Sequence, residues 1–282
     1  IHRGYIDAGS DLIETNTFGA NRFKLTEHGL QHQVEAINRA AVAIARRVIA
    51  GSYREVLLAG SIGPLGVRLA PLGRVSVAEA EAAFSEQIAA LVGQPSEGEP
   101  AGVDLLLIET MSDIKEVEAA ISAARAVAPD LPIIAQMTFT RDDKTLLGYP
   151  PDALATHLAR LDVDAVGINC SGGPAQVLRL IGIVRQLAPQ IPVSAAPNAG
   201  WPEQMAGGRV MYPATPDYFG DYARAFVEAG VGLLGGRRGP ARPRCGPAGG
   251  VVAPPFQVKV ALPAGLPAKA ARAALAALQP SG

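Results

Sequence analysis

Short apolar runs alternate along the chain with longer segments whose apolar residues recur at helical spacing. Most runs are continuously apolar rather than alternating, which is typical of parallel strands buried on both faces. We expect strands at residues 11–15, 56–60, 103–109, 132–138, 164–169, 192–196 and 231–235. We expect helices at residues 27–49, 77–92, 113–127, 151–161, 174–187 and 215–229, and residues 1–9 resemble the end of a preceding helix.

This alternation predicts a barrel. Seven strand–helix repeats are one fewer than a (β/α)8 barrel contains, and 282 residues is a usual length for one such barrel. We therefore expect an α/β TIM barrel whose first strand lies before Ile1 and is missing here. A doubly wound open sheet is the alternative, and it is disfavoured because no glycine-rich dinucleotide-binding sequence follows the first strand.

The end of the chain has a different character. Glycine, proline, alanine and arginine dominate residues 237–255 without any period, which predicts coil, and residues 269–278 resemble one last helix. We therefore expect a barrel domain over residues 1–236. A diverged tail, largely coil with a short terminal helix, follows over residues 237–282.

Composition excludes several classes of protein. Hydrophobic residues make up 49% of the chain and charged residues 18%, so a large core is possible and general disorder is excluded. A net charge of −1 does not favour nucleic-acid binding, and no apolar run is long enough to span a membrane. Two cysteines cannot build a disulfide framework, so we expect a cytoplasmic protein with free thiols.

Polar groups gather at the expected strand ends, where barrels of this type place their chemistry. These groups are Glu14 to Thr17, Ser61, Glu109 with Thr110, Gln136 to Thr138, Asn169 to Ser171, and Asn198. Their convergence on one rim favours a polar active site over an inert scaffold.

Cys170 is the most informative single residue, because it directly follows the fifth expected strand. It could be a small buried hydrophobic residue, a nucleophilic thiolate or a metal ligand. A nucleophile needs a histidine base, but His2, His28, His32 and His157 all lie away from the strand ends. A catalytic zinc site needs three protein ligands, so Cys170 alone leaves the metal interpretation open.

Six sequence strings carry a family resemblance. They are IETNTFGANRFKL (13–25), AGSIGP (59–64), IETM (108–111), GINCSGGP (167–174), PNAGWPE (197–203) and YPATPDYF (212–219). Together they resemble the homocysteine S-methyltransferase family, in particular the homocysteine-binding modules of cobalamin-dependent methionine synthase and of fusions with methylenetetrahydrofolate reductase. The resemblance runs from Ile1 to about Gly236, and it implies a TIM barrel that methylates the thiol of homocysteine to give methionine.

The resemblance also implies a metal and its ligands. In the family, Zn²⁺ held by three cysteines binds the homocysteine sulfur as a thiolate and presents it to a methyl group. Cys170 matches the first zinc cysteine and would be catalytic, and Asn198 matches a position that gives zinc an oxygen ligand. Glu109 matches the carboxylate that holds the substrate ammonium. Asn16 and Thr17 lie beside the substrate, although tying down the first loop is an equal alternative for both.

The methyl donor and partner modules follow from the resemblance alone. They are methyltetrahydrofolate, delivered through cobalamin on a separate module, with homocysteine as the small-molecule partner. Homologues that use S-methylmethionine or betaine share the same zinc chemistry, so these donors stay open.

Two departures from the family bear on activity. The family's glycine-rich loop after its first strand is absent, and arginines stand at positions 237 and 238 where the family has adjacent cysteines in a GGCCGT string. Arginine cannot ligate a metal, and the remaining cysteine is Cys245. We therefore expect an impaired methyltransferase with little or no bound zinc. A catalytically silent binding module is the alternative. The third alternative is a phosphate-binding lyase or aldolase that uses the SGG turn after Cys170 to bind an anion. It is disfavoured because the chain has no strand-end lysine for a Schiff base.

Overall fold

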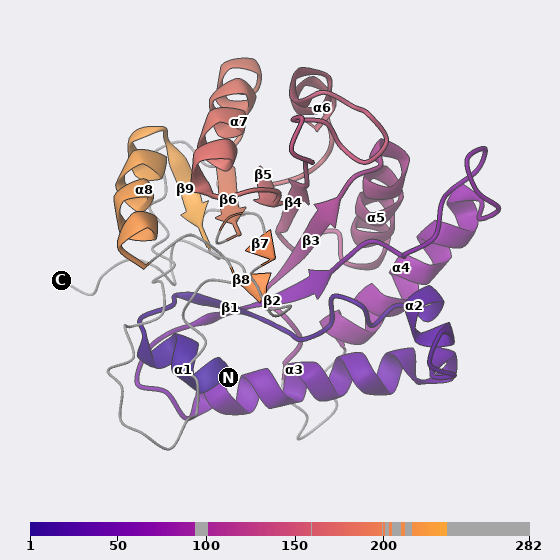
Figure 1. The fold of residues 1–282 in the computed structure, drawn as a ribbon. Helices are drawn as coiled ribbons and strands as arrows, with labels where there is room; N and C mark the ends of the chain where they lie inside the picture. Colours follow the sequence, from indigo (N-terminus) through magenta and orange to yellow (C-terminus); the bar gives the residue numbers. More distant parts are fainter. Residues whose placement is uncertain are drawn as a thin grey trace.

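The computed structural model describes residues 1–93, 101–158, 160–198, 200, 203–204, 210–211 and 216–235. These residues form a curved parallel sheet whose outer face is covered by helices (Figure 1). The expected tail over residues 237–282, including its terminal helix, lies outside the described residues.

Seven parallel strands form the sheet, and their order follows the sequence. They are β1 (Leu12–Glu14), β2 (Leu57–Ile62), β3 (Leu105–Met111), β4 (Ile133–Met137), β5 (Ala165–Cys170), β6 (Val193–Pro197) and β9 (Val231–Leu234). A doubly wound sheet would reverse its strand order at a switch point, so that alternative is wrong. The arrangement is that of a TIM barrel less its first strand, with β1 and β9 at the two edges of the described sheet.

All seven predicted strands overlap observed ones, but a small antiparallel pair was not predicted. This pair, β7 (Glu203–Gln204) and β8 (Val210–Met211), lies between β6 and the last described helix along the chain. Strands of two residues carry no recognisable hydrophobic period, so the sequence gives no signal for them.

The helices alternate with the strands as expected. They are α1 (His2–Asp7), α2 (Arg22–Thr26), the 3-10 helix η1 (Gln31–Gln33), α3 (Val34–Ala50), α4 (Val77–Val92), α5 (Ile114–Val127), α6 (Pro151–Leu158), α7 (Pro174–Leu187) and α8 (Pro216–Glu228). Ser76 and Glu79 form a capping box at the start of α4, and the Asp113 side chain caps α5. Within the described part of the chain, no helix is long and apolar enough to cross a bilayer.

The single helix predicted over residues 27–49 is wrong at its start. Gly29 adopts φ +69° and follows α2, and η1 then leads into α3. A left-handed residue ends a helix readily when it is glycine, because there is no Cβ to clash. The apolar periodicity continues across this break, which explains why one helix was expected.

The barrel interior has an apolar floor beneath a polar rim. Ala59, Leu105, Leu107, Ile134 and Ala165 form a buried cluster separate from the larger core between sheet and helices. Side chains two residues apart on a strand share a face. Ser61 therefore follows Ala59 on the inner face of β2, and Glu109 follows Leu107 on the inner face of β3, both toward the carboxyl ends of the strands.

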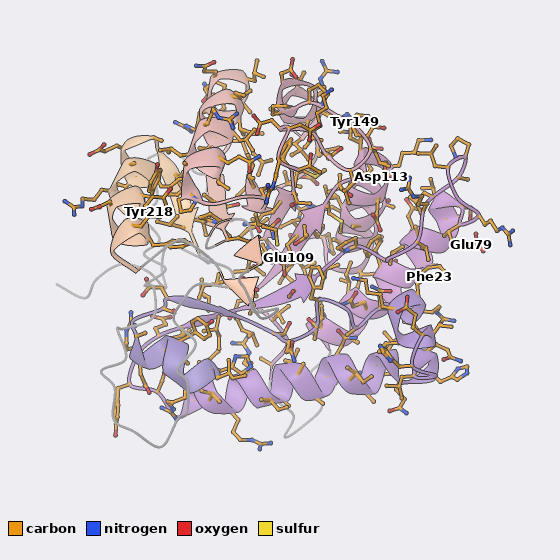
Figure 2. All side chains as sticks on the ribbon, viewed as in Figure 1. Phe23, Glu79, Glu109, Asp113, Tyr149 and Tyr218 are labelled. Atoms are coloured by element: carbon orange, nitrogen blue, oxygen red, sulfur yellow. The ribbon has the colours of Figure 1, made fainter. Side chains whose placement is uncertain are left out.

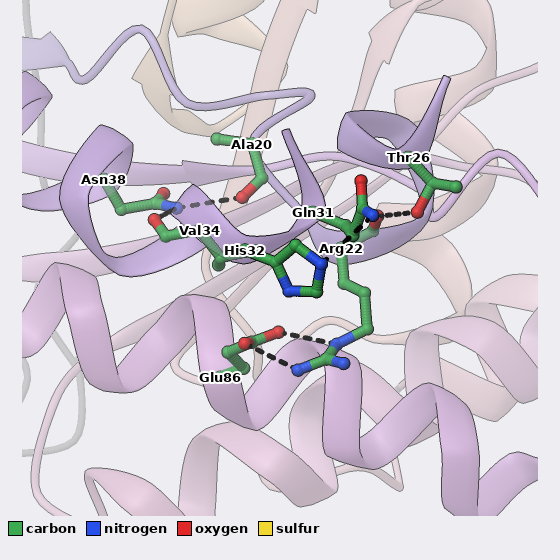
Figure 3. A network of polar contacts seen from close by, with 8 residues as sticks. All are labelled: Ala20, Arg22, Thr26, Gln31, His32, Val34, Asn38 and Glu86. Carbon is green, nitrogen blue, oxygen red and sulfur yellow. Dashed lines mark hydrogen bonds and ion pairs between the residues drawn. The ribbon is translucent and has the colours of Figure 1, made fainter. Parts of the chain in front are cut away.

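The loop after β1 is fixed from outside the barrel (Figure 3). Asn38 Nδ2 donates to the carbonyl oxygen of Ala20 at 2.9 Å, which ties α3 to this loop. Arg22 donates to both carboxylate oxygens of Glu86, at 2.9 and 2.7 Å, and so joins α2 to α4. These contacts tie the segment that follows Asn16 and Thr17 to α3 and α4.

Candidate active site at the strand ends

Glu109 lies near the carboxyl end of β3 (Figure 2). Its side chain is fully buried. Ser61 Oγ donates to Glu109 Oε1 at 2.5 Å, and Asn169 Nδ2 donates to Glu109 Oε2 at 3.1 Å. Ser61 on the adjacent strand β2 and Asn169 on β5, two strands away on the other side, therefore hold the two oxygens of one buried carboxyl group.

Asn169 connects this carboxyl group to Cys170. The backbone N–H of Thr110 donates to Asn169 Oδ1 at 2.8 Å, and Asn169 Nδ2 donates to Thr110 Oγ1 at 2.8 Å. Thr110 Oγ1 lies 3.7 Å from Cys170 Sγ, within hydrogen-bond reach of sulfur. The predicted site residues Glu109 and Cys170 thus belong to one hydrogen-bonded group.

Three residues of this group have left-handed backbone. Thr110 has φ +62°, Cys170 has φ +54° and Ser171 has φ +47°. Such values are uncommon outside glycine and least favourable for a β-branched residue such as threonine. Ser171 is held by its own side chain, which donates to the Asn169 carbonyl at 3.1 Å and accepts from the Phe139 N–H at 2.9 Å. Strained backbone of this kind gathers at functional sites, which supports a site here.

Asn198 lies against the same loop. Its backbone N–H donates to the Cys170 carbonyl oxygen at 3.3 Å, and its Nδ2 donates to the Ser171 carbonyl oxygen at 3.2 Å. Its Oδ1 is buried and has no hydrogen-bond partner among the described residues. A buried amide oxygen left unsatisfied costs about 1–3 kcal/mol, so this atom is suited to accept from a ligand or to coordinate one.

Asn16 and Thr17 differ in their surroundings. Asn16 is exposed, whereas Thr17 is fully buried. Thr17 Oγ1 donates to the Ser61 carbonyl oxygen at 2.7 Å and lies 2.6 Å from Thr15 Oγ1, which itself accepts from the Ser61 N–H at 3.1 Å. These bonds anchor the first loop to β2 directly behind Glu109. Contact of Asn16 or Thr17 with substrate stays a prediction.

The residues present do not fit a zinc site made of three cysteines. Among the described residues, no three histidine, cysteine, aspartate or glutamate side chains come together to hold a metal. The whole sequence contains two cysteines, one fewer than the family set requires. Arg237, Arg238 and Cys245 lie outside the described residues. Cys170 and Asn198 therefore supply one sulfur and one oxygen, and this is short of a catalytic zinc site.

Sequence reasoning placed Ser61, Thr110 and Asn169 at strand ends but assigned them no role. The sequence marked these residues only by their position in the family strings. Ser61 follows a glycine, Thr110 follows Glu109, and Asn169 precedes Cys170. Glu116, a buried carboxyl group in the first turn of α5, was missed entirely. The other charged residues of this helix, Lys115, Glu118 and Arg125, are not buried, and the sequence alone does not distinguish Glu116 from them.

The sequential parallel sheet with polar strand ends defines a TIM-barrel enzyme fold. The family model described as homocysteine S-methyltransferase matches residues 1–237, and the chain belongs to this family.

Two curated relatives are methionine synthases of mycobacteria. The protein of Mycobacterium tuberculosis (strain ATCC 25618 / H37Rv) is 33% identical over 244 residues, covering 84% of this chain and 20% of the relative. The protein of Mycobacterium leprae (strain TN) is 32% identical over 245 residues, covering 84% of this chain and 19% of the relative. The chain thus spans about a fifth of the length of these relatives.

Solved structures of the homocysteine methyltransferase MmuM from Escherichia coli are also similar. The metallated form has 26% identity and a TM-score of 0.63, and the oxidized form has 25% identity and a TM-score of 0.65. Each match covers 84% of this chain and 77% of the MmuM chain. These matches agree with the barrel described above.

Proposed function

We propose that this chain binds homocysteine at the carboxyl ends of its strands and serves in methyl transfer to the homocysteine sulfur, giving methionine. One observation carries the proposal: the buried carboxyl group of Glu109 shares a hydrogen-bonded group with Cys170 at the barrel rim. Membership of the homocysteine S-methyltransferase family and the names of the relatives support the same substrate.

Glu109 would hold the ammonium group of homocysteine. Ser61 and Asn169 each donate to one oxygen of this carboxyl group, and a carboxylate oxygen can accept more than one hydrogen bond. The apolar floor of Leu105 and Leu107 lies beneath, so an ammonium bound here would be partly removed from water. Opposite charges attract more strongly in such a medium than in bulk water, which favours an amino-acid substrate.

The proposed reaction forms one bond and breaks one. The homocysteine thiol loses its proton to solvent, because the thiolate is the nucleophile. The sulfur then forms a bond to the methyl carbon while the bond between that carbon and the donor breaks. We propose that methyltetrahydrofolate is the methyl donor and that the methyl group reaches homocysteine through cobalamin on another module. We also propose that the protein acts in the cytoplasm.

Zinc is the family's means of stabilising the thiolate, and this chain does not supply its three cysteines. No step is therefore assigned to a metal here, and we propose that methyl transfer by this chain is impaired. A binding module without turnover is the second candidate, and the count of two cysteines favours it. In either case Glu109 recognises the substrate.

Titration calorimetry of the purified chain with homocysteine tests the shared part of both candidates. We expect saturable binding of one homocysteine per chain. Mass-spectrometric detection of methionine after adding methyl donors then separates the two candidates, since the binding module gives none. Failure of homocysteine to bind at millimolar concentration would contradict both.

A further inference from the structure

Asn169 joins two strands at the rim of the candidate site through its side-chain amide. It is fully buried, and it is the last residue before Cys170 on β5. Its side chain makes three hydrogen bonds, one to Glu109 and two to Thr110, at 3.1, 2.8 and 2.8 Å. All three bonds reach residues of β3, and β4 lies between β3 and β5 in the sheet.

The orientation of the Asn169 amide is set by its neighbours. The Thr110 N–H can only donate, so the amide oxygen must face it. The acceptor oxygen of Glu109 then faces the amide nitrogen, which donates to both Glu109 Oε2 and Thr110 Oγ1. A flipped amide would place two donors together and two acceptors together. One rotamer of Asn169 therefore satisfies the site, and it fixes where Glu109 Oε2 lies.

The same amide stabilises a strained backbone. Thr110 has φ +62°, a conformation that is unfavourable for a β-branched residue unless surrounding contacts hold it. Both the N–H and the hydroxyl of Thr110 bond to Asn169, so the strained residue is held at two points. Because Thr110 directly follows Glu109, releasing it would also release the backbone that positions the carboxyl group.

We propose that Asn169 is a positioning residue that locks Glu109 and Thr110 into one arrangement and thereby sets the site's selectivity for thiols bearing an α-ammonium group. The inference rests on the proposed function for its substrate, but the lock itself is a property of the unliganded chain. Ser61 supports the other Glu109 oxygen from β2, so loss of Asn169 removes the contact at Oε2 and leaves the one at Oε1.

The lock is tested without any ligand by amide hydrogen exchange at Thr110, followed by NMR. Asn169→Leu removes the acceptor of the Thr110 N–H, whereas Asn169→Asp keeps an oxygen in its place. We expect exchange at Thr110, measured relative to the β4 amides, to rise at least about tenfold in the leucine variant and to stay near the wild-type rate in the aspartate variant. Equal Thr110 exchange in all three proteins would overturn the lock.

Selectivity is tested by the affinities for homocysteine and for 4-mercaptobutanoate, which lacks the amino group. Asn169→Leu removes the donor to Glu109 without placing a second carboxyl group beside it. We expect its homocysteine affinity to fall at least about tenfold, as when a hydrogen bond to a charged group is lost, while its 4-mercaptobutanoate affinity changes less than about twofold. If Asn169 had a purely structural role, its loss would weaken the binding of both ligands equally.

Asn38→Leu is the matched control, because Asn38 is also fully buried and donates from Nδ2 to two backbone carbonyl oxygens. Any loss in this variant should fall equally on the two ligands. If wild type fails to bind homocysteine while Thr110 exchange behaves as expected, the proposed function fails and the lock stands. If wild type binds homocysteine and Asn169→Leu discriminates the two ligands as wild type does, the selectivity role fails and the proposed function stands.

Discussion

The backbone N–H of Leu65 donates to Glu116 Oε1 at 2.7 Å, which joins the loop after β2 to the first turn of α5. Glu116 is only 5% exposed. Burial raises its pKa from 4.5 to about 7, and the charge of Asp113 acts in the same direction. The Leu65 hydrogen bond and the charge of Lys24 oppose this rise in pKa without cancelling it.

Glu116→Gln should therefore stabilise the protein at neutral and alkaline pH. A carboxyl group whose pKa is higher in the folded state than in the unfolded state destabilises the fold once it ionises in the unfolded chain. The effect is absent below about pH 4.5, grows between 4.5 and 7, and is constant above 7. At about 1.4 kcal/mol for each pKa unit, the gain above pH 7 is at most about 3 kcal/mol.

Urea denaturation at several pH values between 4 and 8 measures this gain, since glutamine keeps an oxygen for the Leu65 N–H. Glu55→Gln, at an exposed position, is the control and should show no comparable rise with pH. A Glu116→Gln variant less stable than wild type at pH 8 would show that the charged form of Glu116 is the favoured one.

The strands were predictable because they are continuous apolar runs, and a segment such as LLLIETM has no other plausible place than a buried strand. The closeness of Glu109 and Cys170 was predictable from their places at strand ends, and the two do lie in one hydrogen-bonded group, while their roles stay a prediction. The amide of Asn169 and the carboxyl group of Glu116 were not, because their roles depend on contacts with residues 59 and 51 positions away. Local periodicity carries no information at that range.

Gly167→Ala should strongly destabilise the barrel. A Cβ at Gly167 would lie 1.9 Å from Ser194 Oγ and 2.3 Å from the Ser194 carbonyl oxygen, so β5 and β6 would have to separate. Overpacking of this kind costs about 1–3 kcal/mol or more. Gly182→Ala in α7 is the control, because its Cβ would meet nothing within 4 Å.

Thermal denaturation distinguishes the two alanine variants. We expect a clear loss of stability for Gly167→Ala and a gain of about 0.5–1 kcal/mol for Gly182→Ala, since alanine is the better helix former. Similar melting temperatures for wild type and Gly167→Ala would mean that β5 and β6 are not packed as described.

Glu109→Gln should separate substrate binding from stability. A glutamine can keep both observed contacts, because its oxygen can accept from Asn169 and its amide can donate to the Ser61 hydroxyl. The fold should therefore melt within a few degrees of wild type. Without the negative charge, homocysteine affinity should fall at least about tenfold, because hydrogen bonds to charged groups contribute about 1.5–3 kcal/mol. Unchanged affinity by calorimetry would remove Glu109 from the substrate site.

The chain should bind little zinc. The sequence offers Cys170 and Cys245 as its two thiols, and arginines occupy positions 237 and 238. Even loss of groups that support metal ligands lowers metal affinity about 10- to 100-fold, and loss of two of three ligands should lower it further. Elemental analysis should therefore find well under one zinc per chain at neutral pH.

The double variant Arg237→Cys with Arg238→Cys should bind about one zinc per chain, because three thiolates complete the ligand set of a catalytic site and leave a position for substrate. Cys170 is held by the Thr110 contact and by the bond from Asn198 to its carbonyl oxygen, so its place does not depend on the new cysteines. Adding Cys170→Ala to the double variant should abolish the gain. Stoichiometric zinc in the original chain, lost on Cys245→Ala, would instead show that Cys245 has replaced the missing ligands.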